Sequence, residues 1–309
     1  MENYLFYAGA EHEGIRLDRF LSDHIDGLSR SFIQKIIAEN KVTVNGRIVK
    51  SKTSLKEGDE IRLELPSCAE PEILPQNIPL DILYEDGDVV VVNKPKGMVV
   101  HPAAGHYSDT LVNALLYHCS GSLSGINGVM RPGIVHRIDK DTTGSLIVCK
   151  NDRAHEAISS QLKDHSITRK YLAICLGVLK EDTYRIEGPI GRHPQDRKRM
   201  AINYRNGKPA ITHVKVLERM QGSTFIECRL ETGRTHQIRV HMSSIGHPLL
   251  GDEIYGDTKN RYRLQGQTLH ACLLGFNHPV TGEYIETKAE IPLYFDELLK
   301  KLRIGGINK

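Results

Sequence analysis

Two helices followed by short strands are predicted by the hydrophobic pattern of the first 65 residues. Residues 15–21 and 32–37 each place apolar side chains at helical spacing, and Ser29 stands where it can cap the second helix. The pattern alternates in residues 41–49, around an Asn-Gly turn, and again in residues 58–65. We therefore expect residues 1–65 to form a small α/β domain.

Residues 66–79 interrupt this pattern with four prolines and little periodicity. Such a composition is typical of a semi-rigid linker rather than of a packed element. We interpret the segment as the boundary between the small domain and a second domain that spans residues 80–309.

The second domain combines several apolar strands with a few amphipathic helices. Strands are predicted at 82–84, 89–92, 145–150, 171–176 and 224–230. Helices are predicted at 110–118, 152–162 and 235–245. Asn151 or Asp152 can cap the second of these helices and Thr235 the third, while Gly246 can end the third.

A polar cluster lies between two apolar runs in GIVHRIDKDTTGSLIVCK, residues 133–150. Within six positions it brings together His136, Arg137, Asp139, Lys140 and Asp141. A functional site held between rigid elements would have this pattern, but so would a solvated hairpin loop. The spacing alone leaves both interpretations open.

The net charge of +3 is modest, so a nucleic-acid partner has to be argued from local charge. Residues 14–56 carry nine Lys or Arg against four acids, and residues 192–219 are the most basic stretch, with a hairpin turn predicted at Asn206-Gly207. Each segment suits phosphate contacts, although each could be an ordinary solvated surface. The candidate RNA contacts are Arg16, Arg30, Lys35, Lys41 and Arg47 in the first segment and Arg197, Lys198 and Arg199 in the second.

Several classes of protein are disfavoured by what the sequence lacks. No apolar run approaches the roughly 18 to 20 residues that span a bilayer, and the N-terminus does not resemble a signal peptide. The six cysteines are far apart and include no C-x-x-C pair, which argues against a zinc site and a disulfide framework. We expect a cytoplasmic protein with no membrane segment and no metal site.

The chemistry that remains is an acid on a loop, with arginines elsewhere in the chain. This combination suits a nucleophilic carboxylate, and it equally suits a structural ion pair. There is no phosphate-binding G-x-x-x-x-G-K-[ST] loop and no G-x-S-x-G nucleophile elbow. The residues by themselves do not name a substrate.

Four motifs in order resemble those of one enzyme family. HRIDKDTTG, residues 136–144, resembles the H-R-[LI]-D-x-[DE]-T-[ST]-G signature of the pseudouridine synthases that modify ribosomal and transfer RNA. The same family's other motifs are similar to NKPKGMVVHP (93–102), RKYLAI (169–174) and LETGRTHQIRVHMSSIGHPLLGDEIYG (230–256). Together they cover most of residues 80–300.

The first domain resembles a different family. RLDRFLSDHIDGLSRSFIQKIIAENKVTVNG, residues 16–46, is similar to the small RNA-binding domain of ribosomal protein S four. The sequence departs from that family at Asn40, where glycine is usual at the turn from helix to strand. Asparagine tolerates the left-handed conformation better than other non-glycine residues, so the departure is mild.

The resemblance to pseudouridine synthases implies a reaction and its catalytic residues. These enzymes detach uracil from its ribose, rotate it and rejoin it through a carbon, so no cofactor is needed. Asp139 matches the essential acid, which either attacks the anomeric carbon or forms an ion-pair-like intermediate. Arg239, with Arg234 as the alternative, is expected to pair with Asp139, since a carboxylate in a largely dry pocket needs a cation to stay ionised.

Tyr171 and Arg137 complete the site that the resemblance implies. Tyr171 would stack on the detached base and act as general base when the new bond forms, although a buried tyrosine of a strand can equally be structural. Arg137 would fill the space that the uridine leaves when it is flipped out of its stack. His136 is expected to shape the loop.

The same resemblance implies an α+β fold: a catalytic domain with a mixed, mostly antiparallel sheet and flanking helices, preceded by the small α/β RNA-binding domain. Large-subunit ribosomal RNA is the expected partner, with transfer RNA as the alternative, because the appended domain and residues 191–201 are more similar to the ribosomal branch. We expect a monomer. Two other classes stay open: a non-catalytic RNA-binding or ribosome-assembly factor, and a metal-dependent nuclease, which would need clustered ligands.

Overall fold

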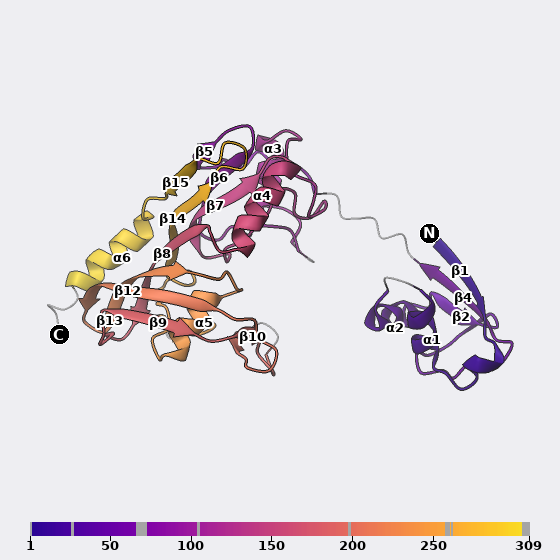
Figure 1. The fold of residues 1–309 in the computed structure, drawn as a ribbon. Coiled ribbons are helices and arrows are strands. Elements are labelled where there is room, and N and C mark those ends of the chain that lie inside the picture. The colour runs from indigo at the N-terminus through magenta and orange to yellow at the C-terminus, as the bar shows by residue number, and fades with distance from the viewer. Residues whose placement is uncertain are drawn as a thin grey trace. The chain divides into compact units, whose positions relative to one another are not determined.

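The computed structural model describes residues 2–25, 28–65, 73–103, 106–196, 199–256, 260 and 262–304 (Figure 1). The chain divides into two compact units, Met1–Glu70 and Pro71–Lys309. Arg197 and Lys198, two of the predicted RNA contacts, lie outside the described residues. Residues 73–79, which we assigned to the linker, fall in the second unit, where Ile73 is buried in the core.

The N-terminal unit packs two helices, α1 (Leu17–His24) and α2 (Arg30–Ala38), on a four-stranded antiparallel sheet. The strand order is β1 (Glu2–Tyr7), β4 (Glu60–Leu65), β2 (Val42–Val44) and β3 (Arg47–Ile48). Ser29 caps α2 as predicted, since its Oγ accepts from the Phe32 N–H at 3.3 Å. Asn40 has a φ of +59°, so it adopts the left-handed conformation expected there. Strand β1 was not predicted.

A buried carboxylate joins the two helices of this unit. The Asp18 side chain is fully buried and accepts two hydrogen bonds from the Arg16 guanidinium, at 2.8 and 3.0 Å. Arg30 donates to the same carboxylate at 3.2 Å and Gln34 at 2.6 Å. Burial favours the neutral acid, but these hydrogen bonds outweigh it and hold the pKa of Asp18 well below its usual range. The carboxylate therefore fixes α2 against the start of α1.

The second unit is organised around a nine-stranded sheet (Figure 1). Its strands, in spatial order, are β5 (Ile82–Glu85), β6 (Val89–Lys94), β7 (Thr143–Cys149), β14 (Leu269–Asn277), β8 (Thr168–Leu176), β13 (Ser223–Leu230), β12 (Ile211–Met220) and β9 (Thr183–Glu187), with β15 (Tyr284–Lys288) paired to β14. Only the β7–β14 pair is parallel among these described strands. The predicted mixed, mostly antiparallel sheet is therefore confirmed.

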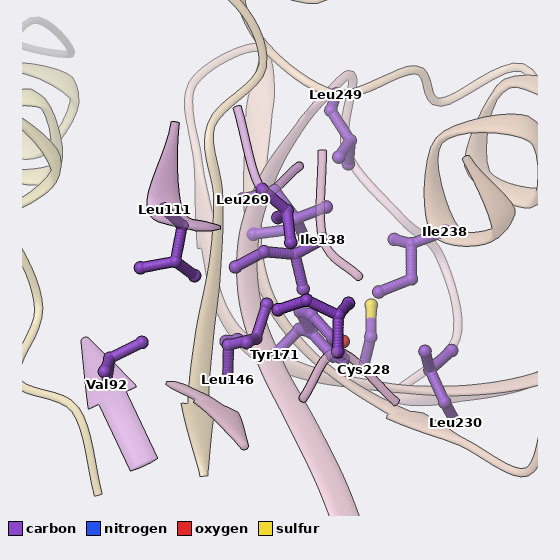
Figure 2. Close-up of a cluster of buried hydrophobic side chains, with 14 of the residues drawn as sticks. Val92, Leu111, Ile138, Leu146, Tyr171, Cys228, Leu230, Ile238, Leu249 and Leu269 are labelled. Atoms are coloured by element: carbon purple, nitrogen blue, oxygen red, sulfur yellow. The ribbon is translucent and has the colours of Figure 1, made fainter. Parts of the chain in front are cut away.

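Helices cover both faces of the sheet. α3 (Leu111–His118) and α5 (Gln237–Ser244) belong to the cluster of buried residues on one face, which includes Val92, Leu146, Tyr171 and Cys228 (Figure 2). α4 (Asp152–Lys163) and α6 (Leu293–Ile304) pack on the opposite face. The first face also buries Ile138, so the residue directly before Asp139 is anchored in the core.

The predicted start of the helix at residues 235–245 is wrong. Helix α5 begins at Gln237, and its N-cap is His236 in the left-handed conformation rather than Thr235. The Gln237 side chain stabilises the turn before the helix, because its Oε1 receives the Arg234 N–H at 3.0 Å. Gly246, with a φ of +79°, follows the end of this helix as expected.

The basic hairpin also turns at a different place. It consists of β10 (Ile190–Arg192) and β11 (Met200–Ile202), so the chain reverses within residues 193–199 and not at Asn206-Gly207. Those two residues belong to a later turn, closed by the Gly207 N–H on the Asn203 carbonyl at 2.8 Å. The Asn203 side chain also accepts from the Asn206 N–H, which stabilises that turn.

Within the described part of the chain, none of the helices has the length and apolar character needed to span a bilayer.

Replacing Asp18 with Asn should destabilise the N-terminal unit by about 2 kcal/mol, because two arginines lose a charged acceptor. Urea unfolding followed by circular dichroism, with hydrogen exchange in α1 and α2, measures this change. Since the pKa of Asp18 is depressed in the folded state, its stabilisation should be present above about pH 4 and decrease as the pH falls below that value. Asp23→Asn is the control, because the Asp23 side chain is 60% exposed.

Candidate active site

The loop that carries Asp139 is fixed from two sides. Lys94, fully buried at the end of β6, donates to the carbonyls of Pro95, Met98 and Lys140, each at 2.9 Å. Burial lowers the pKa of Lys94 to about 7. From the other side, His136 Nε2 accepts from the Ile147 N–H at 3.1 Å, which holds the start of the loop against β7. This contact gives His136 the loop-shaping position expected of it.

Glycine is required where the loop enters β7. Gly144 has a φ of +107°, and a Cβ there would lie 2.3 Å from the Ala271 carbonyl oxygen of β14. Any side chain would therefore push β7 away from its parallel neighbour. Gly144 follows Asp139 by five residues, so this close approach fixes the end of the loop that carries Asp139.

Asp139 meets Arg239, the arginine proposed as its partner. Arg239 Nη1 donates to Asp139 Oδ2 at 2.8 Å, and the other edge of the guanidinium binds Asp252 through Nε at 2.6 Å and Nη2 at 2.9 Å. Asp252 and Arg239 are almost fully buried, whereas the Asp139 side chain keeps 16% of its surface exposed. Arg239 thus bridges two acids, of which Asp252 is buried and Asp139 is partly exposed.

The surroundings of Arg239 favour its charged form. Burial acts to lower the pKa of Arg239, but its hydrogen bonds and charge interactions with Asp252 and Asp139 outweigh burial and raise the pKa above its ordinary value. Arg239 therefore stays protonated in a nearly dry environment. A fixed positive charge beside Asp139 is what an ionised, reactive carboxylate needs.

A second polar contact reaches Asp139 from His236. The Met200 N–H donates to the Tyr255 hydroxyl at 2.7 Å, and that hydroxyl lies 2.9 Å from His236 Nδ1. The Asp139 carboxylate beside Nε2 favours the neutral His236 ring with its proton on Nε2, and Tyr255 then donates to Nδ1. Nε2 lies 3.7 Å from Asp139 Oδ1. Burial lowers the pKa of His236, which favours this neutral form near pH 7.

Tyr171 lies next to Asp139 in a small cavity of about 50 Å³. The same cavity is lined by Arg137, Arg234 and Leu230. Tyr171 is 7% exposed, and burial raises the pKa of its phenol. The hydroxyl is therefore protonated at neutral pH, and the ring forms part of the apolar cluster drawn in Figure 2.

Arg137 and Arg234 stand where the small cavity joins a larger one of about 620 Å³. Arg137 is exposed, and its Nη1 lies 3.5 Å from His101 Nε2. Arg234 donates through Nε to the Pro209 carbonyl at 3.1 Å and forms no hydrogen bond or ion pair with Asp139. The pairing predicted first, with Arg239, is thus the one present, and Arg234 lines both cavities without pairing with Asp139.

The predicted RNA contacts outside this site differ in their surroundings. Arg16 and Arg30 are held by Asp18. Lys35 and Lys41 are largely exposed and lie 3.8 and 3.7 Å from glutamates. Arg47 is exposed on β3. The Arg199 guanidinium carbon lies 5.5 Å from the Tyr255 ring centroid, so this side chain is next to the His236 network.

One group of side chains in the described residues lies close enough together to hold a metal ion: Asp86, Asp88 and His278. His278 Nδ1 accepts from the N–H groups of Val280 and Thr281, so the ring proton is on Nε2, which donates to Asp86 at 2.8 Å. A metal would need the Nε2 lone pair that this proton occupies. The group is therefore better suited to a structural hydrogen bond than to metal binding.

Asp252, Tyr255 and His236 were missed as members of the site. All three lie in the segment of residues 230–256, but nothing in their spacing shows that they surround one arginine. Arg169 was also missed, because it reads as an ordinary charged residue at the start of a strand. Its burial becomes visible only once β8 is placed at the centre of the sheet.

Comparison with known proteins identifies the family. Residues 88–244 match the RNA pseudouridylate synthase family and residues 15–61 match the S4 domain. The chain is 51% identical to an uncharacterized RNA pseudouridine synthase of Bacillus subtilis, YlyB, over 97% of this chain and 98% of that one. It is 47% identical to the ribosomal large subunit pseudouridine synthase D of Zymomonas mobilis, over 96% of each chain.

A solved structure agrees with these sequence matches. The human RNA pseudouridylate synthase domain containing 1 superposes with a TM-score of 0.58 at 29% identity, covering 74% of this chain and 96% of that chain. The chain belongs to the RNA pseudouridylate synthase family. It is therefore an isomerase that converts uridine in RNA to pseudouridine, and the family predicted from the four motifs is confirmed.

Tyr255→Phe should lower kcat about tenfold, or ~1.4 kcal/mol, because His236 loses the hydroxyl that fixes its tautomer. The loss of an acceptor for the buried Met200 N–H should also reduce stability by about 1 to 2 kcal/mol. Pseudouridine formation and thermal unfolding measure the two effects. Tyr284→Phe, at a hydroxyl on the exposed strand β15, should change neither. An unchanged kcat for Tyr255→Phe would mean that the orientation of His236 is unimportant.

Proposed function

We propose that this chain modifies uridines of large-subunit ribosomal RNA and that Asp139 is the essential acid. The substrate is supported by the relatives named ribosomal large subunit pseudouridine synthase D, at 47% identity in Zymomonas mobilis and 42% in Haemophilus ducreyi. The observation that carries the chemistry is the carboxylate of Asp139, open to a cavity on one side and paired with a buried arginine on the other.

The reaction needs a group that reacts at the ribose carbon while the base is free. The bond from N1 of uracil to C1′ of ribose breaks, C5 bonds to C1′, a proton leaves C5 and one is gained at N1. Asp139 supplies either a temporary covalent bond to the sugar or the negative charge that stabilises it. Because Arg239 is held rigidly by Asp252, the position of Asp139 is fixed before the substrate arrives.

Tyr171 is suited to holding the detached base. Its ring lies in the cavity beside Asp139, and its raised pKa keeps the phenol protonated. A protonated phenol is a poor general base, so of the two roles expected for Tyr171, stacking fits these surroundings better than proton removal. The ring also closes the floor of the cavity, since it packs into the apolar core.

Arg137 is suited to replacing the flipped uridine in its stack. Its side chain is exposed, lies two residues before the acid and lines both cavities. A cationic, planar group at this position can enter the vacated space while the base occupies the small cavity. Its neighbour His101 donates through Nδ1 to the Pro102 carbonyl at 3.0 Å, which leaves Nε2 as an acceptor for Arg137.

The S4-like unit is proposed to add RNA affinity rather than chemistry, with residues 1–65 as the RNA-binding domain and residues 80–309 as the catalytic domain. Lys35, Lys41 and Arg47 are the better candidates for phosphate contacts, because Arg16 and Arg30 already share the Asp18 carboxylate. We further propose a cytoplasmic monomer. A non-catalytic RNA-binding factor is disfavoured, since the acid and the tyrosine are both retained.

Asp139→Asn should reduce pseudouridine formation below detection while RNA affinity stays within about tenfold, or ~1.4 kcal/mol. Asp141→Asn, two residues along the same loop, should leave measurable turnover. Arg239→Met should resemble Asp139→Asn in rate and also cost about 3 to 5 kcal/mol of stability, because buried Asp252 loses its partner. Rates, RNA binding and thermal unfolding are measured for all three. Full activity of Asp139→Asn, checked for deamidation, would overturn the carboxylate mechanism.

The substrate is tested by mapping pseudouridines in cells with and without the gene. We expect specific positions of large-subunit ribosomal RNA to lose the modification and to regain it with the intact chain but not with Asp139→Asn. Loss confined to transfer RNA would assign the other substrate. Unchanged maps of both RNAs would contradict a role in either.

A further inference from the structure

Arg169 is a buried arginine without a partner in the described part of the chain. It lies on β8, two residues before Tyr171, so both side chains point to the same face of the sheet. The residue is 6% exposed, and its Nε is buried without a hydrogen-bond partner. No described acid forms an ion pair with it, in contrast to the two carboxylates on Arg239. An unpaired buried charge destabilises a fold, so its presence needs an explanation.

The cavity in front of Arg169 is strongly basic. Its lining includes Arg131, Arg137, Lys163, Arg169 and Arg234, and no Asp or Glu is among the described residues that line it. The cavity shares Arg137, Tyr171, Leu230 and Arg234 with the small cavity that holds Asp139. A nucleotide whose base enters the small cavity therefore has its backbone next to the basic one.

A glycine makes room for the Arg169 guanidinium. A Cβ on Gly233 would lie 2.5 Å from Arg169 Nη1, so any other residue would displace the arginine. Arg234 follows directly, and its Nε is tied to the Pro209 carbonyl. Burial lowers the pKa of Arg169, and the nearby charge of Arg234 also lowers it. Two neighbouring cations without an acid form an arrangement that an anion would stabilise.

We propose that Arg169 and Arg234 bind one phosphodiester of the RNA, adjacent to the uridine that enters the Asp139 pocket. The inference rests on the proposed function in assuming that the base is flipped into that pocket. A guanidinium presents parallel N–H donors that match two phosphate oxygens, and a nearly dry cavity strengthens such a contact. Fixing this phosphate would hold the ribose at a defined distance from Asp139.

The test uses an RNA hairpin containing a uridine that the full-length protein converts. Binding is measured by fluorescence anisotropy in the Asp139→Asn background, so that affinity is independent of turnover. The variants are Arg169→Met, Arg169→Lys and the control Arg229→Met, whose side chain is exposed on the opposite face of the sheet. Each protein is tested with the natural RNA and with RNAs carrying one neutral methylphosphonate linkage, either 5′ or 3′ of the target uridine.

Arg169→Met should bind the natural RNA about tenfold more weakly and reduce the slope of log affinity against log salt by about 0.7 to 0.9. One of the two methylphosphonates should weaken the parent protein similarly but have no further effect on Arg169→Met. Arg169→Lys should keep most of the salt slope, and Arg229→Met should behave as the parent. The thermal midpoint of Arg169→Met should be equal or higher, because an unpaired buried charge is removed.

Three results would overturn the assignment. If Arg169→Met lowers the thermal midpoint, and its loss of RNA affinity adds to the loss caused by the methylphosphonate, Arg169 is a structural residue. Unchanged affinity would mean that no phosphate is bound there. If Arg169→Met and Arg229→Met weaken RNA binding equally, Arg169 contributes only non-specific electrostatic attraction to RNA. Turnover by Asp139→Asn would instead contradict the proposed mechanism, and the binding data would still decide the role of Arg169.

Discussion

Arg239 is shared unequally between two acids, and the catalytic site depends on this sharing. The buried Asp252 carboxylate accepts hydrogen bonds from Nε and Nη2 of Arg239. It also accepts from the backbone N–H groups of Ile254 and Tyr255. Only Nη1 is left for Asp139. A single arginine facing one exposed acid could swing into solvent, whereas an arginine already bound on two atoms cannot. The Asp139 carboxylate therefore has a fixed partner while one side of it remains open.

The contrast between Arg239 and Arg169 explains how one fold holds two buried arginines. Arg239 pairs with Asp139 and Asp252, so its charge is compensated within the protein and needs no substrate. The second has no such acid among the described residues, and a glycine admits it to a basic cavity. The sheet supports the second arginine, because Arg169 and Tyr171 lie on the same face of β8, and Tyr171 and Leu230 of β13 line both cavities.

Local structure could be predicted from the sequence where a residue acts on its own neighbours. Ser29 and Asn151 cap their helices, Asn40 is left-handed, and the strands of Val89 and Leu146 are buried. The start of α5 could not be predicted, since it follows a left-handed His236 and a turn that the Gln237 side chain holds through the Arg234 N–H. Motifs brought Asp139, Arg239 and Tyr171 together by resemblance. Asp252, Tyr255 and Arg169 were missed because their importance comes from burial and from contacts between distant segments.

The position of β14 has a consequence for how the chain folds during its synthesis. This strand comes from residues 269–277, yet it lies between β7 and β8 and, among the described strands, is the only link between the two halves of the sheet. While the ribosome is still synthesising the chain, each half can form its local hairpins, but they cannot join until β14 has emerged. Asp139 and Arg239, 100 residues apart, lie in segments of different halves. Nascent chains that lack β14 should therefore have no formed site, and the enzyme should become active only after this strand has been synthesised.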